Sequence, residues 1–184
     1  MKRDLGAKLA VYPTPVYLVA TYDHDNKPNV MTVGWGGVCC SNPPCVAISV
    51  RKATHTYHAL VEREAFTVNL GTEDFAGEAS YFGKVSGKNE NKFEKSGLTP
   101  IKSDFVDAPY IEEMPINIEC KIIHTTEIGS HIQFIGQIVN VKLSDVIKDD
   151  GKPIIEQMKP IVYGVGDNNR YYGLGEIVEY TEIR

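Results

Sequence analysis

The chain has few basic residues relative to acidic ones, and it has no long apolar run. Among its 184 residues are 19 Lys and Arg against 24 Asp and Glu, which gives a formal net charge of -5. Surfaces that bind nucleic acids are basic, so we expect no nucleic-acid partner. No apolar run approaches the roughly 20 residues that cross a bilayer, and no apolar stretch of the signal-peptide type follows the charged N-terminus. We therefore expect no membrane partner and a cytoplasmic protein.

Several motifs of known chemistry are missing as well. The four cysteines match neither a paired C-x-x-C zinc site nor a thioredoxin-like motif. There is no G-x-G-x-x-G of a nucleotide-binding βαβ unit and no G-x-S-x-G of a hydrolase. His55 and His58 have a spacing that would allow a shared metal ion, but no third ligand stands at motif spacing. We therefore expect no metal site and no catalytic side chain of these kinds.

What the sequence does contain predicts a β-rich globular fold. Its 42% hydrophobic and 23% charged residues are ordinary for a globular protein. A chain of this length most simply forms one domain, over residues 1–184. Alternating apolar and polar residues predict strands at 16–22, 116–122 and 131–143, the last two forming a hairpin. Many short strands separated by Gly and Pro favour a barrel over a doubly wound sheet.

Helical patterns are few and short. One begins at Thr54 or Thr56, a second at Thr72, and a third at Asn91, because each of these side chains can cap a helix. Gly97 is expected to end the third helix.

Residues 29–44 hold the most informative segment. Strand-forming residues give way there to Gly34, Gly36 and Gly37, which flank Trp35, the only tryptophan. Glycine inside a strand usually marks a bulge, a bend or the close approach of a ligand or another backbone. An aromatic side chain beside bare backbone predicts a place for a flat cofactor with polar edges, although Trp35 could also be a core aromatic.

A polar segment, Arg51-Lys52-Ala53-Thr54-His55-Thr56, follows the next strand pattern. Thr54 and Thr56 lie at a predicted helix start, where unpaired N–H groups and the helix dipole favour an anion. Two interpretations remain open from the residues alone. The segment binds a phosphate, or Thr54 is only a cap beside two solvated cations.

The order of these segments resembles the flavin reductase-like family, whose members have the FMN-binding split barrel, and within it the flavoredoxin branch. The motifs that carry this resemblance are Pro15-Val16-Tyr17-Leu18-Val19, Asn29-Val30-Met31-Thr32, Ser41-Asn42-Pro43-Pro44, Phe66-Thr67-Val68-Asn69-Leu70, Ser86-Gly87, Asn91-Lys92-Phe93, Gly97-Leu98-Thr99 and Tyr171-Tyr172-Gly173-Leu174-Gly175. The resemblance covers nearly the whole chain. It implies a mainly β split barrel with a few short helices, a homodimer and FMN as the cofactor.

The resemblance also assigns roles within a candidate site. The residues expected beside the flavin ring are Asn29, Val30, Met31, Thr32 and Trp35, with the backbone near Cys39, Cys40 and Ser41. The residues expected beside the phosphate and the ribityl chain are Arg51, Thr54, His55 and Thr56.

Three further residues are assigned by position in the family pattern. Lys92 is expected to approach the flavin or its phosphate; Asn91 stands where the family often has Asp. His131 matches a position that contacts the cofactor, and Tyr163 is expected to form a wall of the site, together with the Tyr171-Tyr172 pair. Each has an alternative interpretation: Lys92 in a solvated stripe of lysines, His131 as an exposed structural residue, and the tyrosines as core aromatics.

The resemblance implies two-electron transfer from transiently bound NAD(P)H through FMN to a second acceptor, which could be free flavin, ferric iron or a protein partner. An alternative is an FMN electron carrier with no NAD(P)H oxidase activity of its own. A third is a split barrel that has lost its cofactor and acts as a structural dimer. Because a flavin carries its own redox chemistry, none of these requires a catalytic side chain.

Overall fold

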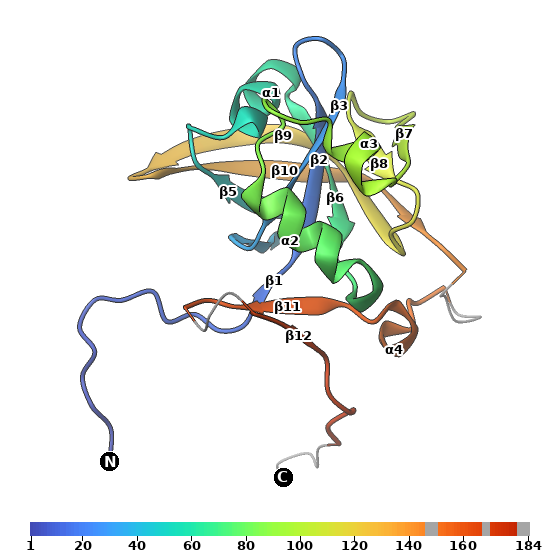
Figure 1. Cartoon of the computed structure of the whole chain (residues 1–184). Helices are drawn as coiled ribbons and strands as arrows, with labels where there is room; N and C mark the ends of the chain where they lie inside the picture. Colours follow the sequence, from blue (N-terminus) through green and yellow to red (C-terminus); the bar gives the residue numbers. More distant parts are fainter. Residues whose placement is uncertain (146–150, 167–169, 180–184) are drawn as a thin grey trace.

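A seven-stranded antiparallel sheet forms the body of the protein in the computed structural model, which describes residues 1–145, 151–166 and 170–179 (Figure 1). In spatial order its strands are β3 (Pro28–Val33), β2 (Tyr17–Tyr22), β6 (Ala65–Leu70), β9 (Ile116–Ile128), β10 (His131–Leu143), β5 (Pro44–Val50) and β4 (Gly36–Ser41). The expected mainly β architecture is confirmed. The predicted hairpin is present too, with a first strand that continues to Ile128.

The linkage between β3 and β4 requires this sheet to curl into a barrel. The two strands lie at opposite edges of the sheet, yet only Gly34 and Trp35 separate them in the chain. A connection this short spans at most about 11 Å between the flanking Cα atoms. The two edges therefore meet at a seam. Residues 29–44 thus do not form one strand, because the chain leaves one edge of the sheet after Val33 and joins the other edge at Gly36.

Close packing explains the small residues at the seam. A Cβ at Gly36 would lie 3.0 Å from the Ala47 carbonyl oxygen and from the Tyr17 ring. The Trp35 carbonyl accepts a hydrogen bond of 2.8 Å from the Ser49 N–H, which fixes the linker against β5. Glycine at position 36 thus allows backbone and ring to approach where a side chain would prevent it.

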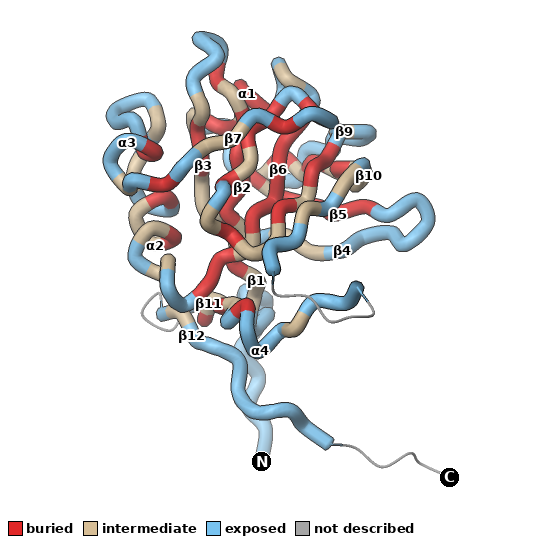
Figure 2. The backbone as a smooth tube through the Cα atoms, turned by 90° about the vertical axis from the view of Figure 1, so that its right-hand side faces the viewer, coloured by how far each residue is buried: buried red, intermediate tan, exposed pale blue. Residues whose placement is uncertain are grey.

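Strand β2 is buried on both faces and serves two cores, as the red central strands of Figure 2 show. Leu18 packs with Phe82 and Phe93 outside the barrel, whereas Val19 packs with Phe66 inside it. Successive side chains of a strand point to opposite faces, so one strand can join both clusters. The outer cluster is what holds two helices beside the edge strand β3.

The helices are short. They are α1 (His55–Arg63), α2 (Ala76–Lys84) after the 3-10 turn η1 (Glu73–Phe75), α3 (Lys92–Ser96) and α4 (Ile155–Met158). The starts predicted near Thr54 and Asn91 are confirmed, Thr72 precedes the 3-10 turn that leads into α2 without a side-chain cap, and α4 was not predicted. The Asn91 side chain accepts a hydrogen bond from the Glu94 N–H, so asparagine acts as the cap of α3. Gly97 ends α3 with a φ of 76°, as predicted.

Two small sheets complete the fold. One comprises β1 (Thr14–Pro15), β11 (Ile161–Gly164) and β12 (Arg170–Gly173), and the other β7 (Pro100–Lys102) and β8 (Pro109–Ile111). In Figure 1 the three-stranded sheet lies below the barrel, and both ends of the chain extend away from it. This sheet brings tyrosines of β11 and β12 to the same side of the barrel as α2. No helix in the described ranges is long and apolar enough to cross a membrane.

Candidate ligand-binding groove

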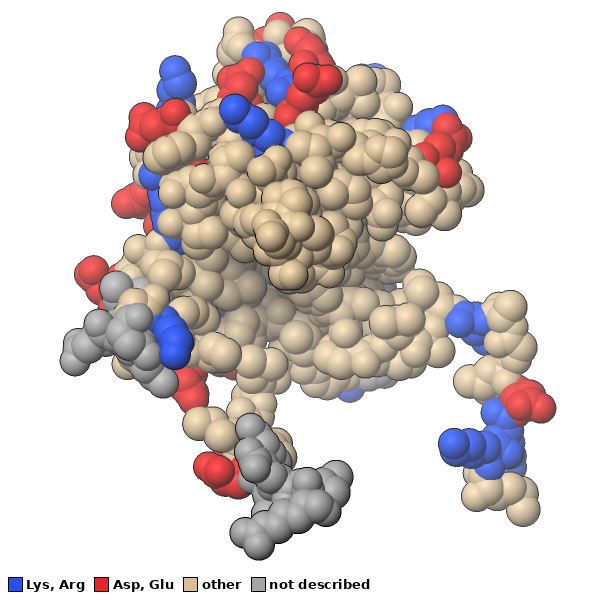
Figure 3. All heavy atoms as spheres, turned by 180° about the vertical axis from the view of Figure 1, so that it is seen from behind, with Lys and Arg blue, Asp and Glu red and all other residues tan. Residues whose placement is uncertain are grey.

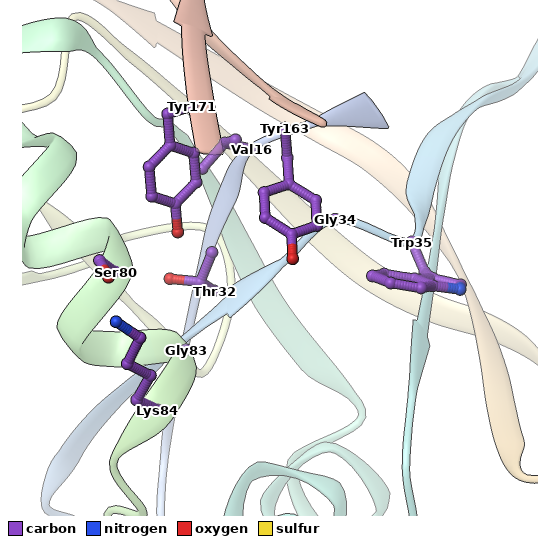
Figure 4. Close-up of a pocket in the computed structure, with 9 residues that line it drawn as sticks. All are labelled: Val16, Thr32, Gly34, Trp35, Ser80, Gly83, Lys84, Tyr163 and Tyr171. Carbon is purple, nitrogen blue, oxygen red and sulfur yellow. The ribbon is translucent and has the colours of Figure 1, made fainter. Parts of the chain in front are cut away.

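Two adjoining hollows form a groove between the barrel and α2. We call the first the aromatic end; it has a volume of about 290 Å³ and is lined by Val16, Thr32, Gly34, Trp35, Ser80, Gly83, Lys84, Tyr163 and Tyr171 (Figure 4). We call the second the helix end; it has a volume of about 200 Å³ and is lined by Met31, Ala53, Thr54, His55, Thr56, Phe82, Gly83, Lys84, Val85, Ser86, Gly87 and Lys92. Gly83 and Lys84 line both, so the two hollows adjoin at the C-terminal end of α2.

No carboxylate lines either end of this groove. The ionisable lining residues are Lys84, Lys92 and His55, together with the tyrosines. The chain as a whole carries a net charge of -5, so this local composition differs from that of the molecule. A polar groove lined by cations and hydroxyls, without acids, suits an anionic ligand.

Strand β3 forms the floor of the groove and is held in place from the α2 side. The Thr32 hydroxyl donates a hydrogen bond of 2.5 Å to the Ala79 carbonyl. The Lys92 ammonium group donates to the carbonyls of Val30 and Phe82 at 2.8 and 3.0 Å. These bonds fix the spacing between β3 and α2, and therefore the width of the groove.

Lys92 is buried rather than part of a solvated stripe. Lys92 is 4% exposed, whereas the other lysines of the stripe, Lys84, Lys88 and Lys95, are exposed. Burial lowers its pKa from 10.5 to about 8. The amine lines the helix end of the groove while two of its hydrogens bond carbonyls, which leaves it one donor for a ligand.

The start of α1 has no side-chain cap. Thr54 is extended, and its hydroxyl donates to the Arg51 carbonyl at 2.9 Å instead of accepting a bond from a helix N–H. The interpretation of Thr54 as a side-chain cap is therefore wrong. The first N–H groups of a helix, when no side chain satisfies them, form an anion-binding position. In this protein that position opens onto the helix end of the groove.

The loop after α2 closes the helix end. Asn29 donates from its amide to the Thr56 hydroxyl at 2.9 Å, and both side chains are buried. A Cβ at Gly87 would clash with the Asn29 amide oxygen and the His55 ring. Glycine is thus required for the loop to approach the start of α1.

Aromatic rings define the other end. Trp35 is 40% exposed, which excludes the interpretation as a core aromatic, and its ring is stacked with His131 at a centroid distance of 6.2 Å and an interplanar angle of 10°. Tyr163 and Tyr171 lie with ring centroids 5.7 Å apart. Figure 4 shows the Tyr171 hydroxyl directed towards Thr32, whose own hydroxyl points towards α2. Burial, and to a lesser degree Tyr163, raises the pKa of Tyr171.

The structure brings most, but not all, of the expected site residues to this groove. Met31, Thr32, Trp35, Thr54, His55, Thr56, Lys92 and Tyr163 line it, with Asn29 hydrogen-bonded to Thr56 and His131 stacked on Trp35. The side chain of Val30 is fully buried in the outer core, but its carbonyl binds Lys92.

Other expected residues lie elsewhere. Cys39, Cys40 and Ser41 are exposed on β4 beyond Val38, at the hairpin, and none of them lines the groove. Arg51 is exposed and does not line it either. The assignment of these four residues to the cofactor stays a prediction from the resemblance.

Sequence reasoning missed the contribution of α2. Ser80 and Lys84 line the groove from this helix, and neither was among the expected site residues. Their spacing of four residues places both side chains on one helix face, and this was the available signal. Tyr171 was considered only as a possible wall.

Comparisons with known proteins show which family the chain is similar to. The sequence profile of the family described as "Flavin reductase like domain" matches residues 9–167. A flavin reductase of Pseudomonas putida is 32% identical over 132 residues, covering 72% of this chain and 74% of that protein. The flavoredoxin of Desulfovibrio vulgaris (Miyazaki F) is 45% identical, with a TM-score of 0.92 over 98% of this chain and 97% of that one.

A second solved structure, the flavoredoxin from Methanosarcina acetivorans, is 27% identical, with a TM-score of 0.89 over 98% of this chain and 95% of that one. The resemblance found in the sequence motifs is thus confirmed over nearly the whole chain. Barrel, short helices and matched profile together lead to one conclusion: the chain belongs to the flavin reductase-like family.

Proposed function

We propose that the chain, as one domain over residues 1–184, binds FMN in this groove and transfers two electrons from NAD(P)H to a second acceptor. The observation that carries the proposal is the acid-free groove, which has an uncapped helix start at one end and aromatic rings at the other. FMN has the matching division, with a phosphate at one end and a planar ring at the other. The printed names of the similar proteins, flavoredoxin and flavin reductase, support a flavin as the ligand.

The helix end has the chemistry that a phosphate requires. A buried phosphate dianion without partners is very costly, so it needs N–H groups, hydroxyls or cations. The start of α1, the Thr54 and Thr56 segment, the Ser86-Gly87 loop and the free donor of Lys92 provide these groups. His55, with its ring against the same loop, adds a further donor.

The aromatic end suits the ring. Thr32 on the floor, Trp35 at the seam and Tyr163 on β11 surround a space of mixed polarity. When bound, FMN supplies the hydride and electron chemistry, and the protein's residues hold and orient it. This division explains a site with no paired carboxylates and no nucleophile. NAD(P)H is then expected to bind transiently over the exposed ring face, and the acceptor is free flavin, ferric iron or a protein partner.

The second candidate is an FMN electron carrier that NAD(P)H does not reduce. Its support is the 45% identity to a protein named flavoredoxin, which exceeds the identity to the flavin reductase. Both candidates use the same groove, and they differ only in the electron donor.

We further propose that the protein acts as a homodimer. Seen from behind, charged side chains gather along the top and sides, and the middle of that face is uncharged (Figure 3). Large apolar side chains are also exposed on three strands of the barrel: Val38 on β4, Ile123 and Ile128 on β9, and Val141 on β10. Burying these exposed apolar side chains between two copies of the chain would stabilise a dimer. Light scattering coupled to gel filtration tests this proposal, and a monomer at micromolar concentration contradicts it.

Two measurements test the flavin function. The freshly purified protein is expected to show a flavin absorption spectrum, or to quench the fluorescence of added FMN. Protein that does neither contradicts the proposal and supports a structural role. Steady-state oxidation of NADH and NADPH with added FMN then separates the candidates: rapid turnover supports the reductase, and reduction only by a protein donor supports the carrier.

A further inference from the structure

Lys84 occupies a distinctive place in the groove. It is the last residue of α2 and, with Gly83, lines both the aromatic end and the helix end. Figure 4 shows its amine beside Ser80 and on the cavity side of the helix. Lys84 therefore lies where the two halves of a bound ligand would join.

The charge of Lys84 is not used by the protein itself. Among the described residues no ion pair or hydrogen bond involves its ammonium group, and no carboxylate lines either hollow. By contrast, Lys52 pairs with Glu127 at 2.8 Å, and Lys92 is bonded to two carbonyls. A cation without a partner beside a cavity is available to a ligand.

The connectivity of FMN determines what such a cation meets. The ribityl chain joins the ring at N10, and the neighbouring polar edge of the ring is N1–C2=O. With the phosphate at the helix end and the ring at the aromatic end, a residue at the junction lies near N10, where N1–C2=O is the nearest polar edge of the ring that can accept from a cation. Two-electron reduction near neutral pH adds two electrons and one proton, at N5, and leaves a negative charge on N1–C2=O. A cation there binds the reduced flavin more tightly than the oxidised one.

We propose that Lys84 contacts the N1–C2=O edge of the bound flavin and raises its reduction potential. This inference rests on the proposed function and assigns a role to a residue outside the family motifs found in the sequence. Binding and reduction of the flavin are linked. The ratio of the affinities for reduced and oxidised FMN therefore determines how far the midpoint potential of bound FMN differs from that of free FMN.

The test measures the midpoint potential of bound FMN in Lys84→Ala and Lys84→Arg, with Lys88→Ala as the matched control. Lys88 is an exposed lysine four residues further on. It does not line the groove but a separate hollow on the other side of His55. Lys84→Ala is expected to reduce the preference for reduced flavin by on the order of tenfold, as for a lost charge-assisted contact. For a two-electron couple, tenfold corresponds to a decrease of about 30 mV. Lys84→Arg and Lys88→Ala are expected to keep the wild-type potential.

Dissociation constants for FMN and riboflavin complete the test, because Lys84→Ala should weaken oxidised forms of both ligands equally and only slightly. An unchanged potential in Lys84→Ala overturns the inference. So does a loss of affinity confined to FMN, which would make Lys84 a phosphate ligand. Flavin binding by the wild-type protein is measured first. If the wild type binds no flavin, the proposed function fails; if it binds flavin and the Lys84 variants give either result above, only the inference about Lys84 fails.

Discussion

Two neighbouring hollows that share lining residues differ in whether carboxylates line them. The helix end of the groove has none, whereas the hollow on the other side of His55, which we call the acidic hollow, is lined by Asp23, Asp25 and Glu90. Its carboxylates lie among the lysines Lys27, Lys88 and Lys92. His55, Gly87 and Lys92 line both hollows. The acidic hollow serves the local fold: Asp23 accepts hydrogen bonds of 2.9 Å from the N–H groups of residues 25 and 27 in the turn between β2 and β3. The sign of the net charge therefore does not predict the charge of a binding site, since acids gather where turns need acceptors.

Of the residues that line both hollows, Lys92 is expected to give the largest loss of stability when it is substituted. Lys92→Met removes the donor to two buried carbonyls and leaves both unsatisfied. Each unsatisfied buried acceptor costs about 1–3 kcal/mol, so we expect the free energy of unfolding to decrease by about 2–4 kcal/mol. Urea denaturation measures this loss. An unchanged stability would show that Lys92 does not hold β3 to α2.

Lys92 also makes the free energy of unfolding depend on pH. Burial lowers its pKa from 10.5 to about 8, so between these values the unfolded chain binds a proton that the folded chain does not. Stability rises with pH where the unfolded state binds more protons, at a limiting slope of about 1.4 kcal/mol per pH unit for one group. The difference in unfolding free energy between wild type and Lys92→Met should therefore grow from pH 8 to pH 10. A difference that stays constant over this window contradicts the lowered pKa of Lys92 in the folded protein.

A carboxylate introduced into the helix end of the groove should weaken FMN binding, whereas one introduced into the acidic hollow should not. Ser86→Asp puts a carboxylate at the helix end, and Asn89→Asp puts one in the acidic hollow as its control. Because like charges at close range repel strongly, Ser86→Asp should weaken FMN binding by on the order of tenfold or more and riboflavin binding little. Asn89→Asp should change neither. Fluorescence titration with both ligands decides, and equal effects of the two variants would mean that the phosphate does not bind at the helix end.

The smallest effect is expected at the rim. Arg51 is exposed outside the groove, so its interaction with a phosphate is screened by solvent. Arg51→Ala should weaken FMN binding only about two- to fivefold, and the effect should vanish at high salt. A large, salt-independent loss would place Arg51 in direct contact with the phosphate.

The sequence predicts most strands and the ends of α3 because these depend on local chemistry, as Asn91 and Gly97 show. Thr54 and Thr72, by contrast, do not act as side-chain caps. The position of β4 was not predictable in this way, because no local signal shows that β3 and β4 lie at opposite edges of one sheet. That topology separates Cys39, Cys40 and Ser41 from the groove lining.

The same limit applies to the candidate site. Met31, Thr32 and Thr56 were found from strand and helix-start patterns, and the structure places all three on the groove. Ser80 and Lys84 become groove residues only because α2 packs beside the edge strand, which is a tertiary arrangement. Sequence alone could not reveal the two carbonyl partners of Lys92, since they belong to β3 and to α2.

The seam of the barrel has a practical consequence. Trp35, which lies at the seam, is the only tryptophan in the protein. Its indole is partly open to solvent and lines the aromatic end of the groove. All tryptophan emission therefore originates at a single point beside the groove. The protein carries an intrinsic optical probe, with which occupancy of the groove and opening of the seam can be followed in real time without any attached label.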